Sequence, residues 1–212
     1  MLPTDHLFAF LLASVVLVLI PGPSVLFVVS RALAHGRRAA LGSVTGNSAG
    51  SVVLVLLVAF GLGSAVERSL VVFTVVKLVG AAYLVYLGVR TYRERGQLAA
   101  LLDTGSPTGT GRHVFRQGIV VGVTNPKALV FYAAVLPQFI DPHRGGVPVQ
   151  LAALGLAFVL IAMVLDALWG LAAGTVRDWF ARSPGRLSVL GGAGGLTMVG
   201  LGVGLAVTGR SE

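Results

Sequence analysis

Two proline-containing interruptions within long apolar runs constrain this chain more than any other feature of its sequence. LVLIPGPSVLF surrounds Pro21 and Pro23, and VGVTNPKALVF surrounds Pro126. Proline removes a backbone hydrogen bond from a helix and frees a carbonyl group, which lipid cannot satisfy. Each interruption is therefore expected where protein or a water-filled cavity covers it. Because the two lie in corresponding apolar runs of the two halves, they predict the solute site of a transporter.

The composition is that of an integral membrane protein. Hydrophobic residues make up 55% of the chain, charged residues 11%, and the mean hydropathy is +0.88, whereas a soluble domain carries about a quarter charged residues. Because Asp5 and His6 stand where a signal peptide has a basic region, the first apolar window predicts a retained helix. Windows long enough to cross about 30 Å of hydrocarbon are Phe8–Val29, Ala39–Leu62, Leu70–Val89, Gly118–Phe139, Val149–Ala173 and Leu187–Val207.

The basic residues predict the orientation of the chain in the membrane. Eleven arginines fall in three alternate connections, residues 30–38, 90–117 and 176–186, whereas three fall in the other connections and the C-terminal tail. By the positive-inside rule, we expect the three basic connections in the cytoplasm and both termini outside. The net charge of +8 then follows from orientation, and no nucleic-acid partner is expected.

The windows divide into two halves of three. We expect one repeat in residues 1–92, a cytoplasmic linker in 93–113 that includes the low-complexity run TGSPTGTG, and a second repeat in 114–212. Because three is odd, the halves cross the membrane in opposite senses. The sequence therefore predicts an all-α integral membrane protein with six transmembrane helices in two inverted three-helix repeats, in which helices 1 and 4 are broken by proline. The residue-level similarity of the halves is faint, and a chance match of glycine- and leucine-rich helices is the alternative explanation.

Glycine recurs at a spacing of four in the second window, at Gly42, Gly46 and Gly50. Such a stripe lets another backbone approach closely. It indicates either helix packing alone or a face along which helices move during transport.

Three lysine or carboxylate side chains lie within the windows. Lys127 directly follows Pro126 and lies about 13 Å deep at 1.5 Å per residue, and Asp166 is the sole carboxylate of any window. Charges at such depth mark functional sites unless they are paired. Asp166 suits either an ammonium group or a transported proton, and the alternative is a structural ion pair with Lys127 or Lys77. Lys77, a second candidate for ion coupling, lies nearer the membrane surface and could instead extend to the interface.

The polar side chains near the breaks complete a candidate site. Asn125 is placed to cap the half-helix that begins at Pro126, while Asn47 belongs either to the site or to an interhelical hydrogen bond. Backbone N–H groups at a broken helix suit a carboxylate, and freed carbonyls with Asp166 suit an ammonium group. We therefore predict a zwitterion site that comprises Pro21, Gly22, Pro23, Ser24, Asn47, Asn125, Pro126, Lys127 and Asp166.

Three segments are similar to the LysE/RhtB family of bacterial amino-acid exporters. They are PGPSVLFVVSRALAHGRRAALGSVTGNSAG, KLVGAAYLVYLGVRTYR and FRQGIVVGVTNPKALVFYAAVLPQF. The early PGP together with NPKALxFxxxxLPQF is specific, and the similarity runs from about Leu7 to Val207. It implies export of amino acids or related metabolites across the bacterial inner membrane, driven by proton exchange, and possible homodimers. The motif positions are Pro21, Gly22, Pro23, Asn125, Pro126 and Lys127, and the resemblance selects no single substrate.

Other classes of function fit the sequence less well. An exporter of another small solute stays open, but a divalent cation would need more than one buried carboxylate, and the chain has no cysteine. The absence of cysteine also excludes a redox protein that uses a thiol pair. A non-transporting assembly subunit is the remaining alternative. No GxxxxGK[ST] phosphate loop occurs, and we expect neither a cofactor, a resident metal nor an enzymatic activity.

Overall fold

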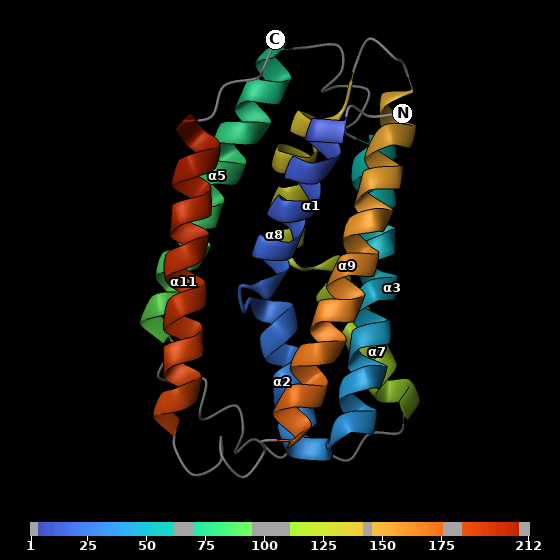
Figure 1. The fold of residues 1–212 in the computed structure, drawn as a ribbon, viewed down its shortest axis with the longest axis vertical. Coiled ribbons are helices and arrows are strands. Elements are labelled where there is room, and N and C mark those ends of the chain that lie inside the picture. Colours follow the sequence, from blue (N-terminus) through green and yellow to red (C-terminus); the bar gives the residue numbers. More distant parts are fainter. Residues whose placement is uncertain (1–3, 62–69, 95–110, 142–145, 176–183, 208–212) are drawn as a thin grey trace.

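The computed structural model describes residues 4–61, 70–94, 111–141, 146–175 and 184–207, and the regular elements of these ranges are all helices. In the bundle, α5 packs along α11 on one side, α1 and α2 lie centrally, and α3 packs against α7 and α9 on the other side (Figure 1). The elements are α1 (Thr4–Leu19), α2 (Pro23–His35), α3 (Arg37–Gly61), α5 (Leu70–Arg93), α7 (Gly111–Val123), α8 (Pro126–Val130), the π-helix η2 (Phe131–Val135), the 3-10 helix η3 (Leu136–Phe139), α9 (Val147–Thr175) and α11 (Pro184–Val207).

The described helices fit a protein that crosses a membrane several times. Four helical segments are long and apolar enough to span it, and the bent pair of α1 and α2 makes a fifth when it is counted as one span. The apolar part of α11, Gly192–Val207, covers about 24 Å at 1.5 Å per residue, less than the hydrocarbon thickness. An all-helical, multi-pass membrane protein is thereby confirmed, whereas six spanning helices in two repeats stay a prediction.

The first predicted break separates α1 from α2. The two helices are inclined by 47° to each other, and Pro23 occupies the first turn of α2, where its missing N–H group costs nothing. Protein covers this break, as predicted. A side chain at Gly194 of α11 would overlap the carbonyl oxygen of Pro21, and Met198 lies against Gly22.

The second predicted break lies between α7 and α8. Only Thr124 and Asn125 separate the two helices. The Asn125 carboxamide accepts hydrogen bonds from the backbone N–H groups of Lys127, at 3.1 Å, and Ala128, at 3.4 Å. The predicted capping role of Asn125 is therefore confirmed. The chain continues as a π-helix and then as a 3-10 turn, which are irregular forms that recur at functional sites.

All three predicted basic loops are wrong in extent, because the helices continue beyond the apolar windows. Gly36 alone separates α2 from α3, with a φ of 82° that glycine adopts without strain, so residues 30–38 are largely helical. Likewise, Arg90 lies within α5 and residues 111–117 lie within α7. Apolar windows mark only the hydrocarbon-crossing part of a helix, whereas long arginine side chains at its end reach polar surroundings. In the third connection, residues 184–186 lie within α11. Residues 95–110 and 176–183 lie outside the described residues.

The predicted glycine stripe forms the contact between α3 and α7. A side chain at Gly46 would overlap the carbonyl oxygen of Phe115, and one at Gly50 would overlap that of Ile119. Gly118 of α7 reciprocates by lying against the backbone of α3. Gly42 is looser, since an added Cβ would lie 3.7 Å from the nearest atom, in Val114. The close backbone approach is confirmed at two of the three positions.

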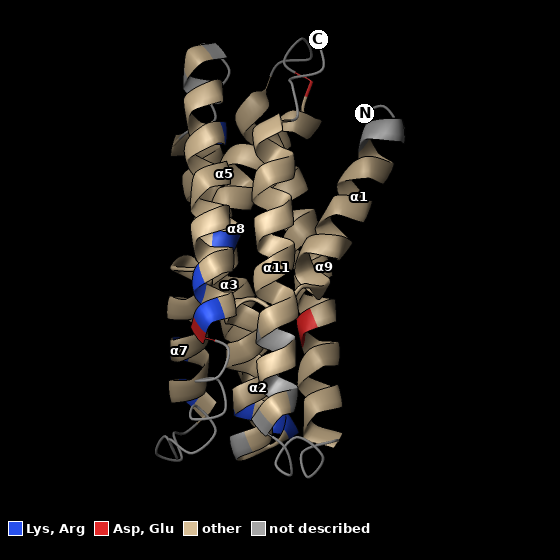
Figure 2. Cartoon of the chain, turned by 90° about the vertical axis from the view of Figure 1, so that its left-hand side faces the viewer, with Lys and Arg blue, Asp and Glu red and all other residues tan. Residues whose placement is uncertain are grey.

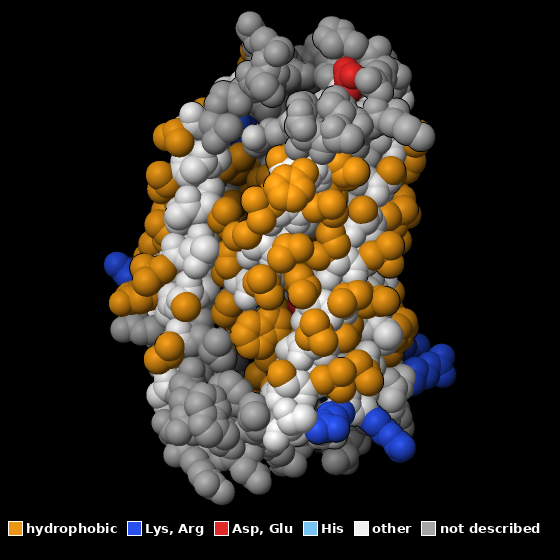
Figure 3. All heavy atoms as spheres, viewed as in Figure 1, with side chains coloured by type: hydrophobic (Ala, Val, Ile, Leu, Met, Phe, Trp, Pro, Cys, Tyr) orange, Lys and Arg blue, Asp and Glu red, His pale blue; other side chains and the backbone are white. Residues whose placement is uncertain are grey.

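The surface of the bundle is apolar around its middle and basic toward one end. Hydrophobic side chains are spread over most of the height of the face shown in Figure 3. Exposed hydrophobic residues of the described ranges include Phe8, Leu57 and Leu160. The described lysine and arginine residues lie mostly in the lower half of the bundle in Figure 2, toward the end at which α2 meets α3. This distribution is typical of helices whose middle faces lipid and whose one end faces an aqueous compartment.

Candidate functional site

A chain of buried hydrogen bonds joins four parts of the bundle beside the two breaks. Asn125, between α7 and α8, donates through Nδ2 to Ser24 Oγ of α2 at 2.6 Å. Ser24 Oγ in turn donates to Asn47 Oδ1 of α3 at 3.1 Å. Asn47 Nδ2 then donates to Asp166 Oδ2 of α9 at 3.3 Å. The structure thus brings four of the sequence-predicted residues into one connected network.

Lys127 connects the second break to the first. Its Nζ donates to the carbonyl oxygen of Leu17 at 2.7 Å and to that of Ile20 at 2.8 Å. In a continuous helix, the N–H group of residue 21 would serve the Leu17 carbonyl, but residue 21 is proline and has none. The lysine of one broken helix therefore satisfies carbonyl groups that are left free by the break in the other.

Asp166 keeps one carboxylate oxygen without a hydrogen-bond partner. Its side chain is 2% exposed, and Oδ1 is buried and unpartnered within the described part of the protein, whereas Oδ2 accepts from Asn47. Among the described residues, no direct ion pair joins Asp166 to Lys127, whose ammonium group is directed at backbone carbonyls. The arrangement therefore leaves a buried carboxyl oxygen that can accept from a cationic ligand.

A cavity of about 30 Å³ lies among these groups. This volume holds about two water molecules and is too small for an amino acid. Polar and apolar side chains share its wall. The lining residues are Val18, Gly22, Ser24, Val25, Asn47, Ser51, Asn125, Lys127, Ala128, Phe158, Ala162 and Asp166.

The two half-helices that begin at the breaks differ in their caps. At α8, Asn125 occupies the N–H groups of the first turn, whereas at α2 the capping residue is Gly22, which offers no side-chain hydrogen bond. Ser24 and Val25, in the first turn of α2, both line the cavity. First-turn N–H groups lack partners within their helix and carry positive partial charge. The cavity is therefore bounded by an uncapped helix N-terminus and by a carboxylate, which together suit a zwitterion.

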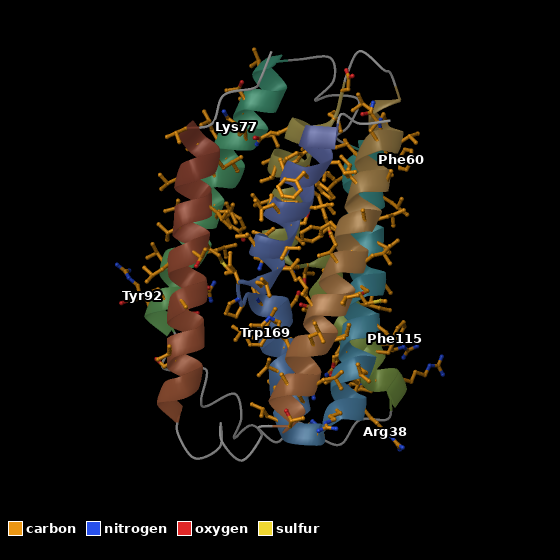
Figure 4. The ribbon with its side chains drawn as sticks, viewed as in Figure 1. Arg38, Phe60, Lys77, Tyr92, Phe115 and Trp169 are labelled. Atoms are coloured by element: carbon orange, nitrogen blue, oxygen red, sulfur yellow. The ribbon has the colours of Figure 1, made fainter. Side chains whose placement is uncertain are left out.

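The remaining predicted residues lie around the cavity or away from it. Pro21 is buried beneath α11, Pro23 is exposed, and Pro126 is half-buried at the start of α8. Lys77 is buried on the upper part of α5 (Figure 4) and does not line this cavity. The structure thus does not bring Lys77 to the other candidates.

Six residues of the cavity wall were not among the predictions, namely Val18, Val25, Ser51, Ala128, Phe158 and Ala162. Three of them follow from the helical spacing of a predicted residue. Ser51 follows Asn47 by one helical turn, while Phe158 and Ala162 precede Asp166 by two turns and one turn on α9. Residues four apart lie on the same face of a helix. Stepping by four from each predicted polar residue would have identified all three.

The sequence is similar to known membrane translocators over nearly its whole length. The family model described as LysE type translocator matches residues 15–209. The chain is 37% identical over 199 residues to a membrane protein of Vibrio cholerae serotype O1, covering 93% of this chain and 95% of that protein. It is 35% identical over 188 residues to a homoserine/homoserine lactone efflux protein of Salmonella typhimurium, covering 89% of each.

A shorter similarity reaches a leucine efflux protein of Salmonella choleraesuis, with 32% identity over 143 residues that cover 64% of this chain and 65% of that protein. No solved structure matches the chain.

Proposed function

The chain belongs to the LysE type translocators, and from this premise we propose that it is a secondary active exporter of amino acids or related metabolites. Members of this family are translocators and not enzymes. The names of two relatives, a homoserine/homoserine lactone efflux protein and a leucine efflux protein, support amino acids as the substrate class. The structural observation that carries the proposal is the free Asp166 Oδ1, which lines the same cavity as the uncapped N-terminus of α2.

In the proposed bound state, each charged end of the substrate has a different partner. The ammonium group binds Asp166, whose Oδ1 is unpartnered, and so compensates a buried charge that is otherwise costly. The carboxylate accepts hydrogen bonds from N–H groups in the first turn of α2, where the helix dipole favours an anion. Ser24 and Asn47 hold these two elements together through their hydrogen bonds.

Transport in this proposal requires a rearrangement of the helices around the cavity. The described conformation leaves about 30 Å³, so an amino acid enters only after the walls separate. The glycine contacts between α3 and α7 provide a smooth surface for such movement. We place the moving boundary between two inverted repeats, residues 1–92 and 114–212, which open the site alternately to each side of the membrane.

We further propose that the transport cycle exchanges substrate for protons at Asp166. A buried carboxylate that alternately holds a proton and an ammonium group cannot hold both, which couples the two movements in opposite directions. Lys77 lies outside the cavity wall, and its part in ion coupling stays a prediction.

The proposed location is the bacterial inner membrane, with the basic end of the bundle in the cytoplasm and both termini outside. The clustering of arginine toward one end supports this orientation. The homodimers implied by the family resemblance stay a prediction.

Counterflow in liposomes tests the proposed function. Vesicles that contain the purified protein are loaded with one unlabelled amino acid at a time, and uptake of the same labelled amino acid is followed. We expect uptake above that of protein-free vesicles for at least one amino acid, and a dependence of net export on an imposed pH gradient. Uptake of none would overturn the exporter and favour the non-transporting subunit, and export that ignores the pH gradient would exclude proton coupling alone.

A further inference from the structure

A second, larger cavity lies on the other side of Lys127. Its volume is about 210 Å³, and α1, α5, η2 and α11 provide its apolar walls. Of the described residues, Lys127 lines both cavities and no other does. The full lining is Ala13, Leu17, Leu84, Lys127, Phe131, Val135, Gln138, Gly200, Leu201, Gly204 and Leu205.

Two glycines of α11 keep this cavity open. An added Cβ at Gly200 or Gly204 would meet no atom within 4 Å. Other glycines of the same helix behave differently, since a Cβ at Gly202 would lie 2.7 Å from the carbonyl oxygen of Ala81 on α5. The glycines of α11 therefore divide into packing positions and positions that leave space beside the cavity.

The π-helix forms another part of the wall. Phe131 and Val135, its first and last residues, both line the cavity. A π-turn is rare and is frequently found at functional sites. Its position against an open volume indicates a ligand-binding surface rather than a packing defect.

We propose that this cavity receives an apolar side chain of the exported amino acid, so that the substrates are branched aliphatic or aromatic amino acids. The inference rests on the proposed function. The 30 Å³ cavity beside Asp166 is too small for a whole substrate even after a modest opening of its walls, and the side chain needs a separate volume.

The size and chemistry of the second cavity fit that part of the substrate. A cavity of about 150 Å³ binds benzene, so 210 Å³ admits a leucine or phenylalanine side chain. The second cavity is adjacent to the cavity beside Asp166, because Lys127 lines both. The side chain of a substrate bound at Asp166 requires this adjacency, whereas a bound lipid chain does not. Gln138, held by its Nε2 hydrogen bond of 3.0 Å to the Ala134 carbonyl oxygen, supplies a polar group at the wall.

The test compares leucine with alanine in counterflow, using variants that fill the cavity. The wild-type protein should exchange leucine at a half-saturating concentration at least about tenfold below that of alanine, because three additional carbon atoms are buried. Ala13→Leu and Gly200→Leu, which fill the cavity from α1 and α11, should each reduce this preference at least about tenfold. Two filling variants on different helices guard against one that fails to fold.

Ala193→Leu is the matched control, since it makes the same change as Ala13→Leu at an exposed position of α11 that lines neither cavity. It should retain the preference for leucine. An unchanged preference for leucine in both folded filling variants would overturn the inference. If native mass spectrometry then shows that these variants lose a bound phospholipid, the cavity binds lipid and not the side chain of the substrate. Exchange of alanine or serine but not of leucine by the wild-type protein would overturn it while leaving the exporter intact; exchange of no amino acid would contradict the proposed function itself.

Discussion

The ammonium group of Lys127 donates a hydrogen bond of 2.8 Å to the carbonyl oxygen of Ile20, the residue directly before Pro21. A second bond of 2.7 Å reaches the carbonyl oxygen of Leu17. The two proline breaks are therefore physically linked, because the residue that follows one satisfies the backbone exposed by the other. This link assigns Lys127 a structural role that is independent of any substrate.

Replacing Lys127 by methionine should destabilise the protein. The carbonyl groups of Leu17 and Ile20 lose their buried donor, and each unsatisfied group costs about 1–3 kcal/mol. Part of that loss is offset because an ammonium group no longer has to be buried, so we expect a net loss of about 1–3 kcal/mol. Thermal unfolding in detergent measures the change. An unfolding temperature unchanged from that of the wild-type protein would show that the link between the breaks is unimportant.

The packing of α3 on α7 predicts that alanine changes the stability of the protein differently at two glycines of the same stripe. Gly46→Ala places a methyl group against the carbonyl oxygen of Phe115, which should separate the helices and cost about 1–3 kcal/mol. Gly42→Ala meets only a methyl group of Val114 at 3.7 Å and should be neutral or stabilise the helix by about 0.5–1 kcal/mol. Unfolding temperatures of the two purified variants provide the comparison, and equal values would contradict the close contact.

Asn125 has two separable roles. Asn125→Ala removes both the cap of α8 and the hydrogen bond to Ser24, whereas Asn125→Ser keeps a side chain that caps helices well. Alanine should therefore be less stable than serine by about 1 kcal/mol. Equal stability of the two variants in thermal unfolding would mean that the cap contributes little here.

The sequence could predict the breaks but not what covers them. Pro21, Pro23 and Pro126 interrupt their helices for the local reason that proline lacks a donor, and Asn125 caps its half-helix at a spacing visible in the sequence. The hydrogen-bond partners of Lys127 depend on how α8 lies relative to α1 and the residue that follows it. Ile20 and Lys127 are 107 residues apart along the chain. No local pattern encodes that contact.

Helix ends and helix faces explain the other differences. The loop expected at residues 30–38 is reduced to Gly36 because hydropathy does not report where a helix ends. Lys77 and Asp166 are alike in the sequence as rare charges in apolar windows, yet only Asp166 lines the cavity. The direction in which each helix faces its neighbours separates them, and that direction is fixed by tertiary packing.

Blocking either end of a transported amino acid should weaken its exchange. An N-acetyl derivative has no ammonium group for Asp166, and a methyl ester has no carboxylate for the first turn of α2. We expect each derivative to compete at least about tenfold less well than the free amino acid. When one charged group of the substrate is absent, its buried partner in the protein is left unpaired, which costs binding free energy. Competition counterflow measures this difference. If both derivatives compete as well as the free amino acid, the result would contradict a zwitterion site.

Counterflow by Asp166→Asn, compared with the wild-type protein in matched liposomes, tests whether the Asp166 carboxylate binds the ammonium group of the substrate. Asparagine has nearly the same shape and retains an oxygen that can accept from Asn47, so the hydrogen-bond network should persist and the unfolding temperature should stay close to that of the wild type. The negative charge that receives the substrate's ammonium group is lost. We expect exchange of the wild-type substrate to fall at least about a hundredfold while folding is retained. Exchange at the wild-type rate would contradict a role of Asp166 in substrate binding.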